Sequence, residues 1–169
     1  MIAMLDLKPL SPQAVNGAIA KAEQYRLLND AAEAESICRD ILDVETDNQT
    51  ALRILTLSLT DQIHRERQAF QEALAAAIRL DDAYERIYYT GIAWERRAKA
   101  RHEEGGGGCQ PAVHDWIRRA MDCFTKAEAV RPAGNDDCLL RWNTCVRFLR
   151  QHPQYAEFEQ EAAEPLMLE

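Results

Sequence analysis

The segment AMDCFTKAEAVRP, residues 120–132, is the stretch on which the fold prediction depends most. It places small residues at Ala120 and Ala127, an aromatic ring at Phe124 and a proline at Pro132. Residues three or four apart share one face of a helix, so these positions form a stripe that a second helix can approach closely. Proline cannot continue a helix, because it lacks the amide and its ring clashes with the preceding turn. The segment therefore predicts a helix that packs tightly on a neighbour and stops near Pro132.

The same spacing of small and apolar residues occurs twice earlier in the chain. The earlier copies are Ala34, Cys38, Ile41 and Ala69, Ala73, Ala76. The interval from Ala34 to Ala69 is 35 residues and the interval from Ala69 to Ala120 is 51 residues. A helix–turn–helix unit of about 34 residues fits the first interval, and the second exceeds it by roughly 17. That excess falls at Gly105–Gly108, a run that no helix interior would tolerate, so we expect a Gly-rich loop at 104–110.

Helical periodicity of apolar residues extends from Pro12 to Arg150, and short polar residues mark the helix starts. The predicted helices are 12–28, 31–44, 48–59, 62–80, 83–103, 111–130 and 136–151, with a short eighth within 154–163. The fourth of these is expected to start at Asp61. Because the linkers are short, successive helices must fold back on each other. The predicted fold class is all-α, a stack of antiparallel helix hairpins with about seven helices and one enlarged turn.

The predicted domain organisation is a lead at 1–11, a helical domain at 12–151 and an acidic tail at 152–169. Within the helical domain, the repeats lie near 15–48, 49–82 and 83–134, and a capping helix follows at 135–151.

Composition and charge exclude several classes of protein. The 169 residues carry 20 Lys+Arg against 28 Asp+Glu, a net charge of −8 that disfavours nonspecific binding to nucleic acid. No apolar run has the length that crosses a bilayer, and the N-terminus lacks the basic flank of a signal peptide. Five cysteines at irregular spacings do not form a disulfide framework. We therefore expect a soluble, cytoplasmic protein that binds neither nucleic acid nor membranes.

The chain resembles the tetratricopeptide repeat family over about residues 15 to 151, which would give three repeats and a capping helix. The family combines two small residues, an aromatic and a proline on the second helix, and 120–132 matches all four. Thr46 and Asp81 stand where the first two repeats would have that proline. The resemblance implies an α-solenoid with a concave groove that holds a peptide or helix of a partner. The implied repeat-packing residues are Ala34, Cys38, Ala69, Ala73, Gly91, Ala120, Phe124, Ala127 and Pro132.

The resemblance also places three stripes of side chains in that groove. The expected groove residues are Arg53, Leu57, Tyr88, Ile92, Arg96, Asn143 and Arg147. Their mixture of guanidinium, amide, phenol and aliphatic groups suits an acidic or C-terminal peptide segment with an apolar anchor. Alternatively, they are ordinary exposed polar residues and edges of the core. The carboxylate clamp of chaperone-tail receptors is not expected, because Ile19, Glu23 and Ile54 occupy three of its positions.

Other chemistry-bearing residues cluster beside the Gly-rich loop. His102, Cys109 and His114 surround it, but their spacing matches no zinc pattern, so no metal is expected. The remaining cysteines, Cys38, Cys123, Cys138 and Cys145, fit the role of small core residues. A basic run at 96–101 could receive the acidic tail within the chain.

No residues form a catalytic constellation, so neither an enzyme activity nor a cofactor is expected. The predicted function is a non-catalytic protein-interaction module, such as an adaptor, scaffold or assembly factor, existing as a monomer or weak homodimer. Two alternatives remain open: a secretion-type chaperone, and a regulator that responds to metal or redox state through the cysteine and histidines of the loop.

Overall fold

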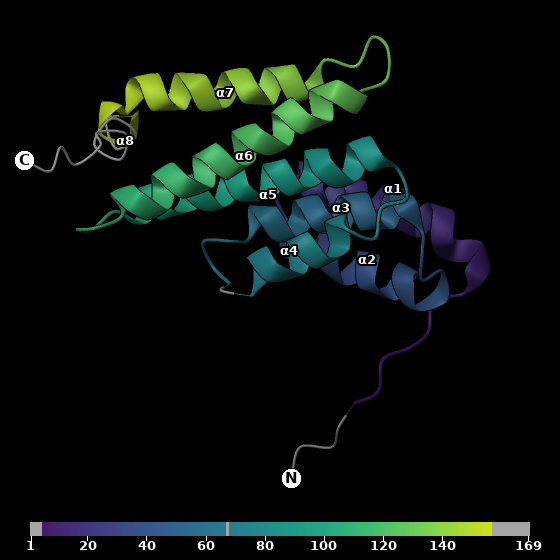
Figure 1. The fold of residues 1–169 in the computed structure, drawn as a ribbon. Helices are drawn as coiled ribbons and strands as arrows, with labels where there is room; N and C mark the ends of the chain where they lie inside the picture. Colours follow the sequence, from purple (N-terminus) through teal and green to yellow (C-terminus); the bar gives the residue numbers. More distant parts are fainter. Residues whose placement is uncertain (1–4, 67, 157–169) are drawn as a thin grey trace, which may run out of the picture.

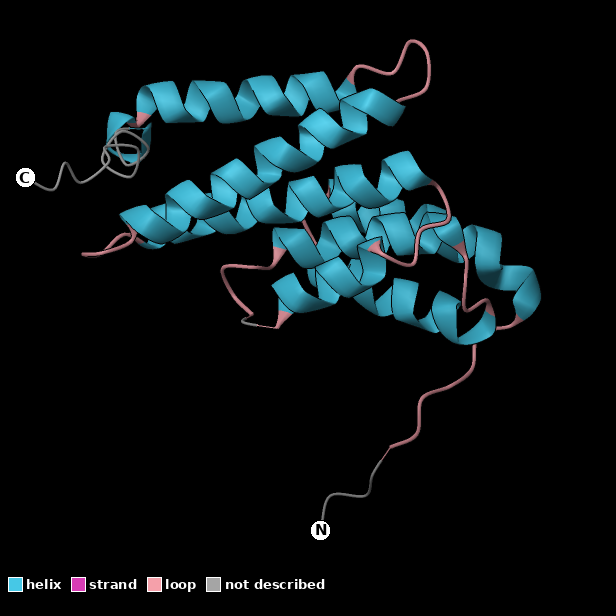
Figure 2. Ribbon diagram, viewed as in Figure 1, coloured by secondary structure: helices cyan, strands magenta, loops and turns pink. Residues whose placement is uncertain are grey.

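The protein consists of packed helices in a computed structural model that describes residues 5–66 and 68–156 (Figures 1 and 2). Within those ranges there are helices, turns and coil but no strands. The elements are the 3-10 helix η1 Pro12–Ala14 and the helices α1 Val15–Leu27, α2 Ala31–Val44, α3 Gln49–Asp61, α4 Ala69–Ala77, α5 Ala83–Glu104, α6 Gln110–Val130, α7 Asp137–Gln151 and α8 Pro153–Ala156. The all-α prediction is confirmed. The acidic tail from 157 onward lies outside the described residues.

Short polar residues start three of the helices by satisfying a free backbone amide of the first turn. Asp30 accepts a hydrogen bond from the Glu33 amide at 3.2 Å before α2. Asn48 and Asp82 do the same before α3 and α5, each at 2.9 Å. Such caps stabilise a helix by about 1 kcal/mol. The predicted boundaries of these helices therefore agree with the structure to within about two residues.

The fourth helix was predicted wrongly at 62–80, because α4 spans only Ala69–Ala77. The residue expected to start it, Asp61, is instead the last residue of α3. Its carboxylate receives the guanidinium groups of Arg26 and Arg96, so it does not cap a following turn. The chain then forms a hydrogen-bonded turn, in which the Arg65 amide donates to the Gln62 carbonyl at 2.9 Å. Asp61 therefore forms ion pairs with α1 and α5 and does not cap a helix, which its local sequence had indicated.

Two kinds of helix contact define the arrangement. Each helix from α1 to α7 packs on the next one along the chain, as expected for hairpins with short connections. In addition, α1, α3, α5 and α7 contact one another in order. The odd-numbered helices therefore form a continuous layer, which positions the groove described below. No helix in the described residues has the length and apolar character needed to cross a membrane.

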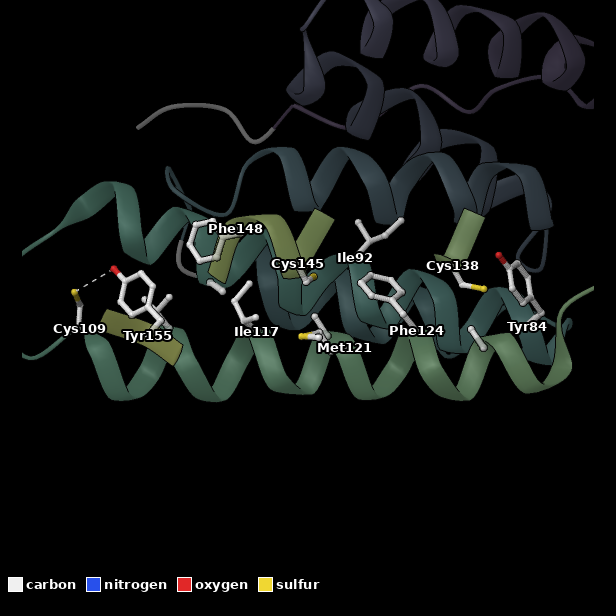
Figure 3. Packing of buried hydrophobic residues seen from close by; sticks show 14 residues of the cluster. Tyr84, Ile92, Cys109, Ile117, Met121, Phe124, Cys138, Cys145, Phe148 and Tyr155 are labelled. Atoms are coloured by element: carbon white, nitrogen blue, oxygen red, sulfur yellow. Dashed lines mark hydrogen bonds between the residues drawn. The ribbon is translucent and has the colours of Figure 1, made fainter. Parts of the chain in front are cut away.

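Small side chains lie where paired helices approach each other most closely. Seven of the predicted repeat-packing residues that carry side chains are buried: Ala34, Cys38, Ala69, Ala73, Ala120, Phe124 and Ala127. Pro132 is exposed, beyond the end of α6. Figure 3 shows Phe124 within the cluster that fills the space between α5, α6 and α7. Gly91 on α5 faces this ring, and a Cβ at Gly91 would lie 2.6 Å from Phe124 Cε1 and 3.0 Å from Cys123 Cβ.

The Gly-rich loop joins the two longest helices. α5 ends at Glu104 because Gly105 has a φ of +66°, a conformation that favours glycine. Gly106 and Gly108 also have positive φ values, of +91° and +78°. A Cβ on any of the four glycines would meet nothing within 4 Å. Backbone conformation, and not close packing, therefore accounts for glycine in this loop.

Replacing Gly91 with alanine should destabilise the protein by about 1–3 kcal/mol, because the added methyl group overlaps the buried Phe124 ring. Gly17→Ala is the matched control, since Gly17 lies inside α1 with nothing within 4 Å of a new Cβ. That control should raise stability by up to about 1 kcal/mol. Urea unfolding followed by circular dichroism measures both. A Gly91→Ala protein as stable as the wild type would show that α5 and α6 do not approach so closely.

Candidate interaction groove

A groove crosses the layer of odd-numbered helices. It consists of two adjoining pockets, of about 400 and 320 Å³, that share Arg53 of α3 and Tyr89 of α5. The first pocket is lined by Gln49, Arg53, Asp81, Asp82, Tyr84, Glu85, Tyr88, Tyr89, Pro132, Asn135 and Asp137. The second is lined by Glu23, Arg26, Leu27, Thr50, Arg53, Ile54, Leu57 and Tyr89. The groove therefore extends from α1 across α3 and α5 to the start of α7.

Tyrosine rings form one wall of the first pocket. Tyr84 and Tyr88, one helical turn apart on α5, stack with centroids 5.5 Å apart and an interplanar angle of 11°. Tyr89 meets Tyr88 edge to face at 5.2 Å. Burial raises the pKa of Tyr88 and of Tyr89, so both phenols stay neutral near pH 7. The wall thus offers flat aromatic surface together with hydroxyl groups.

Ion pairs hold the odd-numbered helices in this arrangement. Arg53 of α3 donates to both carboxylate oxygens of Glu85 on α5, at 3.0 and 3.1 Å. Both bonds come from Nη1, and Nη2 donates to Thr50 Oγ1 at 3.0 Å, so the guanidinium is held from two sides. Asp61 of α3 joins α1 to α5 through Arg26 and Arg96. Charge pairs therefore join α1, α3 and α5, the helices that line the groove.

A further charged group, Glu95, lies beneath this layer and links α5 to α7. Its side chain is 1% exposed, and Oε1 lies 2.5 Å from Lys99 Nζ and 3.7 Å from an Arg141 guanidinium nitrogen. Burial lowers the pKa of Arg141, but the negative charge of Glu95, with a smaller contribution from the Tyr88 hydroxyl, raises it overall. Glu95 Oε2 has no hydrogen-bond partner among the described residues. Glu95 therefore depends on its two cations to remain buried.

The structure brings together only part of the predicted groove set. Arg53, Leu57 and Tyr88 line the groove. Ile92, in contrast, is 1% exposed inside the core, so its assignment to the groove is wrong. The helical spacing of Tyr88 and Ile92 suggested one face, but Ile92 lies on the side of α5 that packs in the cluster with Phe124.

The remaining predicted groove residues line neither pocket. Arg96 binds Asp61, Thr60 Oγ1 at 2.7 Å and the Leu57 carbonyl at 3.4 Å, which leaves it engaged within the fold. Asn143 and Arg147 are exposed on α7 away from both pockets. On that helix, Arg141 is the residue that meets Glu95 and Tyr88 of α5.

Sequence reasoning missed Tyr84, Glu85, Tyr89 and Arg141. A usable signal was present, because several contacts join residues about one repeat apart. Arg53 and Glu85 are 32 positions apart, and the Arg79 guanidinium reaches the Thr46 carbonyl 33 positions earlier. A search for opposite charges at the repeat spacing would have found the Arg53–Glu85 pair.

The charge of the groove is opposite to what an acidic ligand requires. The first pocket is lined by four carboxylates, on Asp81, Asp82, Glu85 and Asp137, and by the single guanidinium of Arg53. That guanidinium is already paired with Glu85, and Arg26 of the second pocket is paired with Asp61. The expectation of an acidic peptide is therefore not supported by the site.

The basic run at 96–101 is used within the fold. Arg97 stacks between Phe70 and Trp116, with its guanidinium carbon 4.1 and 4.2 Å from the two ring centroids. Lys99 pairs with Glu95, and Arg101 donates to the Gly105 carbonyl at 2.7 Å. The predicted docking of the acidic tail on this run concerns residues outside the described ranges.

The histidines and cysteine beside the Gly-rich loop converge on one side chain. His102, Cys109 and His114 each contact Tyr155 of α8. In the described part of the chain, no group of three or more His, Cys, Asp or Glu side chains is placed to hold a metal ion. The five cysteines form no disulfide.

Comparisons with protein-family models, with curated proteins and with solved structures give no match for this chain. Its function must therefore be argued from its own residues.

Replacing Glu95 with alanine should lower the free energy of unfolding by about 1–3 kcal/mol, because Lys99 and Arg141 would lose their shared anion and a cavity would form. Asp115→Ala is the matched control, because Asp115 pairs with Arg119 also at four residues' separation but is 52% exposed. That change should cost less than about 0.5 kcal/mol. Chemical denaturation measures the free energy of unfolding of both variants. An equal loss of stability in the two would contradict a buried structural role for Glu95.

Proposed function

We propose that the chain is a non-catalytic protein-interaction module, a tetratricopeptide-like helical stack that holds a segment of a partner protein in the groove across α1, α3 and α5. The observation that carries this proposal is the junction of two pockets at Arg53 and Tyr89. A groove that crosses several helices suits an extended or helical segment better than a compact small molecule.

The lining residues favour a partner segment rich in lysine or arginine. Asp81, Asp82 and Asp137 carry negative charge that no cation of the described structure neutralises by an ion pair. Two of them, Asp82 and Asp137, stand at helix N-termini, where the helix dipole also favours a carboxylate. The dipole explains how three acidic groups can share one pocket, and a cationic side chain would add to their stabilisation.

The tyrosine wall complements that charge. Guanidinium and ammonium groups bind the faces of aromatic rings, with about 0.5–1 kcal/mol gained at exposed sites. Tyr88 and Tyr89 are half-buried and line the same pocket as the carboxylates, so one basic side chain can meet a ring and a carboxylate together. Tyr84 is 5% exposed and supports the Tyr88 ring by stacking on it. The Arg97 guanidinium, held between Phe70 and Trp116, shows the same pairing elsewhere in this fold.

A variant that neutralises the first pocket tests the proposal. Asp81→Asn, Asp82→Asn and Asp137→Asn together remove three charges, while asparagine keeps the shape and can still cap α5. Segments are first selected by the wild type from a random peptide library and then titrated by fluorescence anisotropy. We expect the selected segments to be basic and the triple variant to bind them roughly tenfold more weakly, from about 0.5 kcal/mol per charge.

The matched control is Asp43→Asn, Asp122→Asn and Glu128→Gln, three exposed acidic positions that line neither pocket. This control removes the same net charge and should bind the selected segments as the wild type does. Selection of acidic segments, or equal affinity for the two triple variants, would contradict the proposed partner chemistry. If no segment is enriched at all, the groove is not a peptide-binding site.

A further inference from the structure

The ends of three helices surround Tyr155 at the opposite end of α5 from the groove. His102 lies near the C-terminus of α5, Cys109 and His114 at the start of α6, and Phe148 near the end of α7. Tyr155 belongs to α8 and is 2% exposed. Figure 3 shows its ring close to Cys109 and Phe148. A helix of four residues is not stable by itself. The segment that begins at Pro153 therefore owes its position to the contacts of Tyr155.

Two imidazoles hold Tyr155 by different atoms. His102 Nδ1 lies 2.7 Å from the Tyr155 hydroxyl oxygen. His114 Nδ1 lies 2.6 Å from the Tyr155 carbonyl oxygen, which can only accept, so His114 carries a proton on Nδ1. The Tyr155 ring also stacks on Phe148 with centroids 5.8 Å apart and an angle of 6°. Tyr155 is thereby held at its ring, its hydroxyl group and its backbone.

Protonation affects these histidines unequally. His114 already donates from Nδ1, so a second proton on its other nitrogen leaves the bond to Tyr155 intact. The His102 ring, however, lies 4.2 Å from the ring of His152, the residue that precedes α8. Positive charge on both rings would place two cations in contact, which destabilises the packed arrangement.

Other charged and titratable side chains also lie around Tyr155. Burial raises the pKa of the Tyr155 hydroxyl, and the positive charge of Arg101 on α5 offsets part of that rise. Glu104 lies 3.6 Å from Arg101. α6 contributes Cys109 and His114, and α7 contributes Phe148. Burial, and then the charge of His102, lower the pKa of His152 below 6.5.

The direction of the pH effect follows from that lowered pKa. A histidine whose pKa is lower in the packed state than in the released state favours packing when it is neutral. The contribution is complete above about pH 6.5 and is lost as the pH falls toward the lowered value.

We propose that His102, His114 and His152 form a pH-sensitive latch, which holds the C-terminal segment from Pro153 through Tyr155 at neutral pH and releases it when His152 becomes protonated beside His102. The device is independent of the groove and of its ligand. In the sequence, the segment so held continues into 157–169, which contains five glutamates and no Lys or Arg.

Hydrogen exchange of the full chain tests the latch. The reporter is the Tyr155 amide, which donates to the His152 carbonyl at 3.0 Å. After correction for the intrinsic exchange rate, its protection should fall severalfold between pH 7.5 and pH 5.5 in the wild type, because the lowered pKa of His152 makes its protonation favour the released segment. His152→Gln, which cannot be charged, should change less than about twofold over the same range. His64→Gln, at an exposed histidine of the α3–α4 connection, should behave as the wild type.

A second readout keeps the proposal falsifiable if His152→Gln loosens α8 at both pH values. Cys109 is 8% exposed beside the Tyr155 hydroxyl, so release of Tyr155 should expose its thiol to iodoacetamide. Peptide mass spectrometry measures the rate at which Cys109 is modified. This rate is divided by the rate measured in Tyr155→Ala at the same pH, because the ratio then no longer depends on how thiol ionisation changes with pH. We expect this ratio to rise by severalfold at pH 5.5. The latch would be overturned if both the Cys109 modification ratio and the protection of the Tyr155 amide stayed constant with pH. It would also be overturned if His152→Gln and the wild type showed the same pH dependence.

Discussion

The close approach of paired helices is the constraint on which the rest of the structure depends. Ala34, Ala73 and Ala120 are completely buried, and Gly91 leaves room for the Phe124 ring where a methyl group would overlap it. Helices that meet over such short side chains lie nearer than helices that meet over leucine. Each hairpin is thereby fixed, and the odd-numbered helices come together in one layer. The groove is a consequence of this layer, because its lining comes from helices that are distant in sequence.

The charged groups of the fold have two separate roles. Arg26, Asp61 and Arg96 join three odd-numbered helices, and Glu95 joins α5 to α7. These residues are paired with one another inside the fold, so their charges are not available to a partner. Asp81, Asp82 and Asp137 remain at the rim of the first pocket, beside tyrosines with neutral hydroxyl groups. The carboxylates that have no ion pair in the described structure therefore favour a basic partner in our proposal, whereas the sequence alone predicted an acidic one.

Most helices and the enlarged turn were predictable because their signals are local, whereas the fourth helix was not. Capping at Asp30, Asn48 and Asp82 and the run Gly105–Gly108 act within a few residues of where they stand. The site was less predictable, since it depends on which way a side chain faces after the helices have packed together. Helical spacing alone could not show that Ile92 enters the core. Nor could it show that Asp61, which was predicted to start a helix, ends α3 and pairs with two arginines.

The central claim is that the layer of odd-numbered helices is the binding surface. The most direct measurement is nuclear magnetic resonance of the uniformly labelled full chain, titrated with a lysine-rich segment selected from a random library. The account predicts the largest amide shifts at Arg53 and Tyr89, where the two pockets meet, and small shifts along α2, α4 and α6. Shifts confined to those even-numbered helices, or to the surroundings of Tyr155, would contradict it.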